Sequence, residues 1–295
     1  MAHLRSVCAM VLVMMVLVCR GGLVHAQERT WTSDDGKEIV GELLRETGEA
    51  VVLKVNNREF TVPLTRLSEA DREWLEARRK ELEERKKESA ALAGTMKTYP
   101  KNDGQQVAFH VYYPTTFSPE KPLPMLILFS PGGQGRGILN SFKDPCEKLG
   151  WIGVGCDTFR NGVPAEELDP LFKELLPIIE KTVPHDPERL FTGGMSGGAS
   201  RAVQYTAKFD RPWKGVISCG GWLGKEFELE YRKGMAVAWV NGNDDKGANS
   251  WLEKDSEVLK RRRCKTKLFA FPGGHVVGPP EVLTEAMRWV DENSR

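Results

Sequence analysis

The sequence has 295 residues, 40% of them hydrophobic and 28% charged, with 42 basic side chains against 41 acidic ones. These proportions are those of an ordinary globular protein, and they exclude the disordered, fibrous and disulfide-dense classes. A net charge this close to zero also provides no electrostatic footprint for nucleic acid, so no nucleic-acid partner is expected.

Residues 1–26 have the pattern of a cleaved secretory signal peptide. Arg5 precedes an unbroken apolar run over residues 7–18, and Ala26 is the small residue that a signal peptidase prefers before the cut. The run is too short to cross a bilayer, and no later segment is as long and apolar, so no membrane span is expected. We therefore expect a protein secreted to the extracellular or periplasmic space after cleavage near Ala26.

A small β-rich module is expected over residues 27–76. Short strands separated by turn-forming residues are predicted over residues 29–32, 38–44, 50–55 and 59–64. Their spacing indicates a small antiparallel barrel. Ser68 and Asp71 form the capping pattern of a helix start. Residues 77–95 continue as a charged linker helix, because eight basic and eight acidic residues interleave between positions 66 and 88.

Residues 96–295 alternate between strand and helix patterns, which predicts a mostly parallel, doubly wound sheet with helices on both faces. Strands are expected over residues 107–113, 125–129, 151–156, 190–192, 215–219, 236–240 and 268–271. Helices are expected over residues 139–149, 165–181, 197–209, 250–263 and 280–292.

The strongest chemical signal is Ser196, in the run Gly194-Met195-Ser196-Gly197-Gly198 between a predicted strand and a predicted helix. A serine in a sharp strand-to-helix turn adopts strained backbone angles, and its neighbours must lack bulk because strand and helix nearly touch there. Helix capping by Ser196 is the alternative interpretation of the same run. The context favours a catalytic nucleophile.

A serine nucleophile needs a base and an orienting acid, and in folds of this kind the chain order is serine, then the acid, then the histidine base. His275 is the only histidine after Ser196, and it lies in a loop after the last predicted strand. For the acid, Asp244 and Asp245 both follow the strand over residues 236–240. We favour Asp245 and keep Asp244 as the alternative.

Oxyanion donors are expected from two places. One is the backbone N–H of Gly197, next to the nucleophile. The other is the glycine-rich loop after the strand over residues 125–129, with Gly133 and Gln134 as the donors. A plain flexible turn is the alternative interpretation of that loop.

Residues 96–295 resemble an α/β-hydrolase of the polyhydroxybutyrate depolymerase and feruloyl esterase kind. The matching runs are Pro122-Leu123-Pro124, Pro131-Gly132-Gly133, the stretch from Asp186 to Phe191 that leads to Gly194–Gly198, and Gly274-His275. The resemblance implies the α/β-hydrolase fold and ester hydrolysis by Ser196, Asp245 and His275. Its strand order would separate Cys156 from Cys219 by three strand spacings, too far for a disulfide. About 200 residues with short loops between the core elements leave little room for a large cap.

Residues 28–76 resemble the small SH3-like homology domain first recognised in endocytic adaptor proteins. The matching stretches are residues 29–32, 36–37, 51–54, 62–64 and 67–71. This resemblance implies the fold, and it leaves open whether the module binds a protein or a surface partner.

The function expected from the whole sequence is a secreted serine hydrolase that cleaves carboxylic esters. Short loops without a cap suit a bulky ester, such as an acylated polysaccharide or a polyester. A serine peptidase of the same fold stays an alternative, as does an inactive hydrolase-like binding or scaffold protein. Neither a cofactor nor a metal is expected, because the scattered histidines form no ligand motif.

Overall fold

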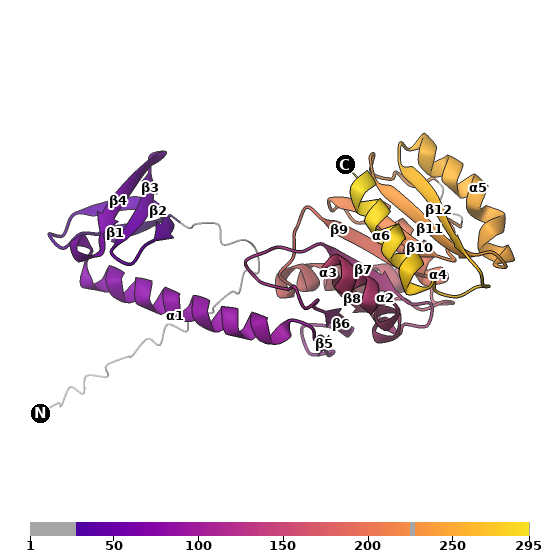
Figure 1. The fold of residues 1–295 in the computed structure, drawn as a ribbon, viewed down its shortest axis with the longest axis horizontal. Helices are drawn as coiled ribbons and strands as arrows, with labels where there is room; N and C mark the ends of the chain where they lie inside the picture. The colour runs from indigo at the N-terminus through magenta and orange to yellow at the C-terminus, as the bar shows by residue number, and fades with distance from the viewer. Residues whose placement is uncertain (1–27, 225–227, 295) are drawn as a thin grey trace, which may run out of the picture.

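The computed structural model describes residues 28–224 and 228–294, so the expected signal peptide lies outside the described residues. Figure 1 shows a small N-terminal sheet, a long helix α1 (Glu69–Leu92) and a larger unit in which helices surround a sheet. Across the described ranges, no helix combines the length and the apolar character that a bilayer crossing needs.

The N-terminal sheet is antiparallel, and its strands pair in chain order. They are β1 (Glu28–Thr32), β2 (Glu38–Glu46), β3 (Ala50–Val55) and β4 (Arg58–Pro63). The short helix η1 (Leu64–Arg66) leads from β4 towards α1. Within the described chain β1 and β4 do not pair with each other. The four expected strands are therefore present, while their closure into an SH3-like barrel stays a prediction.

Helix α1 begins where the capping pattern predicted. The Ser68 side chain accepts a hydrogen bond from the Asp71 N–H at 3.2 Å. Asp71 in turn accepts from the Thr32 N–H at 2.6 Å and pairs with Arg29 at 2.5 Å. One buried carboxylate thus joins the start of α1 to strand β1, and Leu75 on the next turn packs into the small core of this sheet.

The second sheet has eight strands in the order β12-β11-β10-β9-β7-β8-β6-β5. They are β5 (Met96–Tyr99), β6 (Phe109–Tyr112), β7 (Met125–Phe129), β8 (Ile152–Cys156), β9 (Leu190–Met195), β10 (Trp213–Cys219), β11 (Ala236–Gly242) and β12 (Lys265–Phe271). Strands β7 to β12 are mutually parallel, and β5 and β6 add an antiparallel edge. Strand β5 is present in the structure but was not predicted from the sequence.

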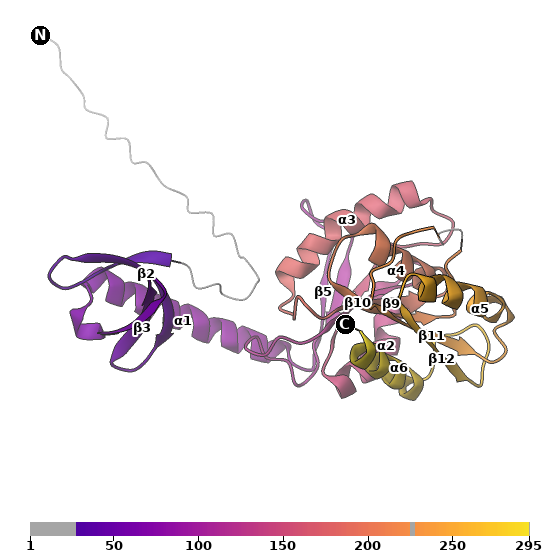
Figure 2. The same ribbon diagram turned by 90° about the horizontal axis from the view of Figure 1, so that it is seen from above.

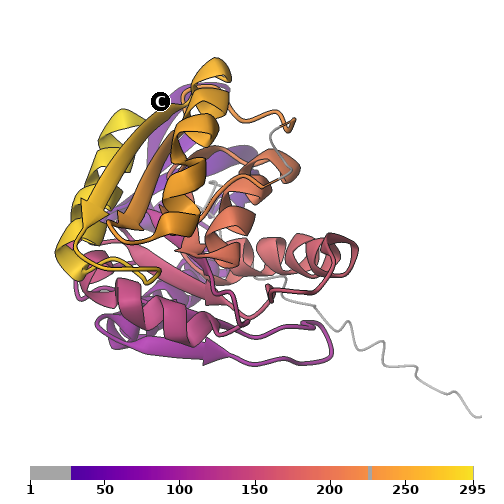
Figure 3. The same cartoon turned by 90° about the vertical axis from the view of Figure 1, so that its right-hand side faces the viewer.

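Helices cover both faces of this sheet, as Figures 2 and 3 show. One face carries α2 (Gly135–Leu149) and α6 (Pro280–Asn293), which contact each other. The other carries α3 (Ala165–Thr182), α4 (Gly197–Lys208) and α5 (Lys246–Arg261). The five expected helices are present, and α2 and α5 each begin four residues earlier than the sequence pattern indicated.

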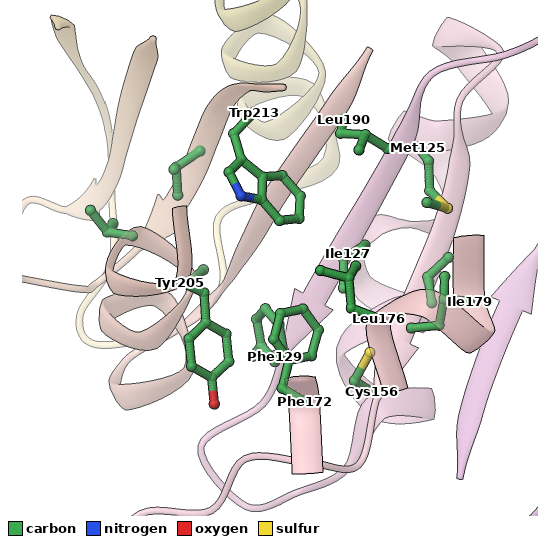
Figure 4. Close-up of a cluster of buried hydrophobic side chains, with 14 of the residues drawn as sticks. Met125, Ile127, Phe129, Cys156, Phe172, Leu176, Ile179, Leu190, Tyr205 and Trp213 are labelled. Carbon is green, nitrogen blue, oxygen red and sulfur yellow. The ribbon is translucent and has the colours of Figure 1, made fainter. Parts of the chain in front are cut away.

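The core beneath α3 and α4 is aromatic (Figure 4). The ring of Phe129 on β7 lies 5.0 Å from that of Phe172, and Phe172 stacks on Tyr205 at 4.6 Å. Every residue of β7 is buried, as expected of a strand covered on both sides. This rigid centre fixes the carboxyl ends of β7 and β9, where the predicted site lies.

The cysteines at positions 146, 156, 219 and 264 are free and buried. Cys156 ends β8 and Cys219 ends β10, with β9 and β7 between them. The prediction that this pair is not bonded is confirmed.

Candidate active site

Ser196 stands at the turn between β9 and α4, with φ 55° and ψ −125°. Such angles are strained for a residue with a side chain and persist only where the surroundings enforce them. Here the Ser196 N–H donates to the Cys219 carbonyl at 2.8 Å, and the Ser196 carbonyl accepts from the Ser200 N–H at 3.0 Å. These two backbone bonds hold Ser196 in the strained conformation.

The glycines around Ser196 are required by close packing. A Cβ at Gly194 would lie 2.3 Å from the Phe129 carbonyl oxygen, and a Cβ at Gly198 would lie 2.2 Å from the same atom. The start of α4 therefore rests directly on the end of β7. Any larger residue at either position would push the nucleophile turn away from the sheet.

His275 lies in the loop after β12, and its ring bridges two groups. Its Nε2 is 2.8 Å from the Ser196 Oγ, and its Nδ1 is 2.7 Å from the Asp245 Oδ2. With the proton on Nδ1, the ring donates to the carboxylate and accepts from the serine hydroxyl. The His275 side chain is 44% exposed, whereas that of Asp245 is 3% exposed.

Asp245 is held firmly because it also caps helix α5. Its Oδ1 accepts from the Ala248 N–H at 3.1 Å, which leaves Oδ2 for His275. Asp244 is exposed, and its N–H donates to the Gly273 carbonyl at 2.9 Å, which ties it to the histidine loop by backbone only. The structure therefore brings Asp245, rather than Asp244, to the imidazole.

Gly220 and Gly242 shape the site, and neither was predicted from the sequence. Gly220 has φ 58°, and a Cβ there would lie 3.0 Å from the Asp245 Oδ2 and 3.1 Å from His275. A Cβ at Gly242 would lie 2.3 Å from the carbonyl oxygens of Gly273 and Gly274. The Gly-Gly pair directly after β10 was the signal that could have pointed to the first of them.

The three expected oxyanion donors lie on neighbouring elements. Gly197 is the first residue of α4, and Gly133 and Gln134 follow β7, the neighbour of β9. Gly133 has φ 71°, and its N–H donates a long hydrogen bond, at 3.4 Å, to the Ser130 carbonyl in a turn. Gln134 is the exposed N-cap of α2. Strand pairing thus places both loops at the same edge of the sheet.

The hydrogen-bonded chain from Ser196 to Asp245 lets the imidazole take the serine proton while the carboxylate fixes the ring. The carbonyl of Cys219 accepts from the Ser196 N–H, but burial raises the pKa of the Cys219 thiol to about 12, so this thiol is a neutral packing group. Among residues 28–224 and 228–294, no three His, Cys, Asp or Glu side chains converge as metal ligands would.

No protein-family model matches the chain, and no curated protein does. Solved structures do resemble it. An S-formylglutathione hydrolase from Agrobacterium tumefaciens is 15% identical with a TM-score of 0.52, and covers 68% of this chain and 95% of its own. Esterase 2 of Thermogutta terrifontis, phosphoramylated by tabun, is 16% identical with a TM-score of 0.52, and covers 67% of this chain and 92% of its own.

A ferulic acid esterase is 17% identical with a TM-score of 0.51, and covers 68% of this chain and 98% of its own. All three are hydrolases built on one fold, and at these identities the likeness concerns the fold. The larger sheet of this chain is mostly parallel and carries helices on both faces. The likeness extends over nearly the whole length of these enzymes, so this chain has the α/β-hydrolase fold.

Proposed function

We propose that residues 96–295 form a serine hydrolase that cleaves carboxylic esters. The observation that carries the proposal is the continuous contact from the Ser196 Oγ through both ring nitrogens of His275 to the buried carboxylate of Asp245. The strained backbone of Ser196 adds support, because strain of this kind gathers at functional sites.

The proposed reaction has two steps. Ser196 attacks the ester carbonyl while His275 takes its proton, and the same proton then passes to the departing alcohol. Asp245 holds the ring and stabilises the imidazolium that forms. The N–H groups of Gly197 and Gln134 stabilise the negative oxygen of the tetrahedral intermediate, and that of Gly133 joins them by leaving its long bond to the Ser130 carbonyl. Water, activated by His275, then releases the acid and restores the serine.

The proposed substrate is a bulky or polymer-linked ester, such as an acylated polysaccharide or a polyester. An open site is supported by the 44% exposure of the His275 side chain. A large ester can reach a hydroxyl at the rim of a sheet without having to enter a closed cavity. The ferulic acid esterase among the similar structures is in keeping with such a substrate.

We also propose the domain division made from the sequence: a signal over residues 1–26, an SH3-like module over 27–76, a helical linker over 77–95 and the hydrolase over 96–295. The similar structures cover 67% to 68% of this chain, which agrees with the size of the hydrolase part. The secreted location and a partner for the module belong to the same proposal.

The test is release of the alcohol from an activated acetate ester, with Ser196→Ala against the wild type. Wild type should turn over, and Ser196→Ala should lose activity by about 10⁵- to 10⁶-fold, to background. Ser250→Ala is the matched control, because Ser250 is exposed on α5 and donates only to the Gly247 carbonyl. Equal background rates in wild type and Ser196→Ala would contradict the proposal and favour a binding or scaffold protein.

Once turnover is established, a panel of acetylated, feruloylated and polyester substrates identifies the acyl group and the alcohol. Peptide substrates in the same panel test the peptidase alternative. Hydrolysis of peptides at a higher kcat/KM than of every ester would replace the esterase assignment.

A further inference from the structure

The carboxylate of Asp157, just after β8, links three elements outside the contacts of the proposed triad. Its Oδ1 accepts from the N–H of Gly135, the first residue of α2, at 2.7 Å. Its Oδ2 lies 3.4 Å from the Nε2 of His110 on β6, and the His110 Nδ1 lies 2.9 Å from the Thr98 hydroxyl on β5. His110 is buried. The antiparallel edge of the sheet is thereby tied to the start of α2.

The bond from Gly135 matters because of what precedes it in the chain. Gly133 and Gln134, two of the expected oxyanion donors, come immediately before this residue. The first N–H groups of a helix lack partners within the helix, and a carboxylate placed there is favoured by the helix dipole. A bond at Gly135 therefore fixes where α2 begins and how the donor loop enters it.

The same end of α2 is pressed against β8. A Cβ at Gly135 would lie 2.6 Å from the Gly155 carbonyl oxygen, and a Cβ at Gly155 would lie 2.0 Å from that of Gly135. The two backbones are in direct contact. This contact limits movement of the helix start towards β8, and the hydrogen bond from Gly135 to Asp157 limits its movement further.

The residues after Asp157 also support the donor loop. The Asn161 N–H donates to the Pro131 carbonyl at 2.8 Å, and Gly132 and Arg160 form an isolated β-bridge. The Cβ position of Gly133 lies 3.2 Å from the Phe159 carbonyl oxygen. Two consecutive glycines have great backbone freedom by themselves. Here the segment over residues 157–161 removes that freedom.

We propose that Asp157 is the positioning residue of the oxyanion loop. By holding the Gly135 N–H, it fixes the loop from which the N–H of Gln134 and, once its long bond to the Ser130 carbonyl opens, that of Gly133 reach the oxygen that becomes negative in the tetrahedral intermediate. This inference rests on the proposed serine hydrolase function.

The test compares Asp157→Ala and Asp157→Asn with the wild type on an activated acetate ester. Loss of one oxyanion donor costs about 10²- to 10³-fold in kcat, so misaimed donors in Asp157→Ala should lower kcat by about 10- to 100-fold with KM little changed. Asp157→Asn keeps an oxygen that accepts from Gly135, and its kcat should recover to within about fivefold of wild type.

Glu147→Ala is the matched control. Glu147 lies at the opposite end of α2, where its carboxylate accepts from the Thr115 N–H at 2.9 Å and from the Tyr112 hydroxyl at 2.7 Å. It therefore also joins α2 to β6 and to a backbone N–H, but far along the helix from the donor loop. Its loss should lower thermal stability while kcat stays within about twofold of wild type.

A second readout separates positioning from general stability. A boronic acid forms a tetrahedral adduct with the serine and places an oxygen among the donors, so it imitates the intermediate. Its affinity should fall in Asp157→Ala by the same factor as kcat/KM, and not in Glu147→Ala. If Asp157→Ala does not fold, Asp157→Glu serves, because the longer side chain shifts the loop and should lower kcat by about tenfold.

Three outcomes would overturn the inference. They are wild-type kcat in a folded Asp157→Ala or Asp157→Glu, an equal loss of kcat in Asp157→Ala and Glu147→Ala, and unchanged boronate affinity alongside a reduced kcat. Failure of the underlying function is distinguishable, because then wild type itself hydrolyses no faster than Ser196→Ala.

Discussion

The two sheets of this protein differ in how much of their surface is covered. The eight-stranded sheet carries helices on both faces, and all residues of β7, β8 and β9 are buried. The N-terminal sheet packs its core against η1 and α1 and leaves four large apolar side chains 37% to 57% exposed: Ile39, Val40, Leu44 and Phe60.

This difference explains where chemistry can arise. A sheet covered on both faces is accessible only at its strand ends, and the carboxyl ends of parallel strands meet at one edge. Ser196, Asp245 and His275 all follow such ends, after β9, β11 and β12. The N-terminal sheet instead leaves apolar side chains on its surface exposed to solvent. The two regions should therefore respond differently to matched substitutions.

After removal of the nucleophile itself, the largest effect is expected at the acid of the proposed triad. Asp245→Asn should lower kcat by about 10⁴-fold, because the amide can hold the wrong tautomer of His275 in place. Asp244→Asn changes an exposed neighbour and should stay within about threefold of wild type. Steady-state kinetics on an activated ester measures both. Equal losses in the two variants would remove the distinction between the two aspartates.

The next largest effect is expected from truncation of a buried tryptophan in the core of each region. Trp31 in the N-terminal module and Trp213 on β10 are both buried, and each indole N–H donates to a carbonyl, of Gly41 at 3.0 Å and of Phe209 at 2.8 Å. Truncation of either to alanine should cost about 3–5 kcal/mol of stability in its own region. Trp213→Ala should lower the melting temperature of the hydrolase. Ester hydrolysis by this variant should then be lost at a lower temperature than in the wild type.

Trp31→Ala should unfold the module and leave ester hydrolysis within about twofold of wild type. Denaturation followed by Trp fluorescence, with activity measured in parallel, checks the pair. Loss of hydrolysis in Trp31→Ala at a temperature where the hydrolase stays folded would mean that the two regions act as one cooperative unit.

Much of this fold could be predicted because strands covered by helices on both faces of a sheet are apolar along their whole length. The run Met125-Leu126-Ile127-Leu128-Phe129 was predicted with its observed bounds, since every residue of it is apolar. Strand β5 was missed because only Met96 and Tyr99 are half-buried and four residues are too few for a pattern. The start of α2 was missed because Gly135 and Gly137 resemble loop residues.

A smaller effect is expected at Gly220, beneath the His275–Asp245 pair. Gly220→Ala combines a positive φ with a Cβ 3.0 Å from the Asp245 Oδ2. It should cost about 1–3 kcal/mol of stability and lower kcat by about tenfold or more. Gly36→Ala is the matched control, because Gly36 has φ 80° with open space around its Cβ position. It should cost about 1 kcal/mol in the N-terminal module and leave kcat unchanged.

Urea unfolding and ester kinetics measure both glycine variants. Wild-type kcat in Gly220→Ala would mean that the imidazole and the carboxylate tolerate a displacement, and that their spacing is not critical. The role of Gly220 could not be predicted from the sequence, because its neighbours in space lie 25 and 55 positions away along the chain. The same reason hid the contact of Asp157 with Gly135.

The smallest expected effect is at the four buried thiols. Burial raises the pKa of Cys219 to about 12 and that of Cys264 to about 11, and it also raises those of Cys146 and Cys156. The neutral thiol dominates well below such values, so these four thiols of the native protein should react negligibly with a thiol reagent at pH 8. Unfolding in guanidinium should expose all four. Fast reaction of a native thiol would show that the core opens readily.

The central claim is that Ser196 is the nucleophile, and covalent labelling tests it most directly. A fluorophosphonate should add one label to the wild type, and mass spectrometry of the digested protein should place it on Ser196. Ser196→Ala should take up no label, and His275→Ala should react far more slowly. A label on another residue, or equal labelling of wild type and Ser196→Ala, would contradict the account.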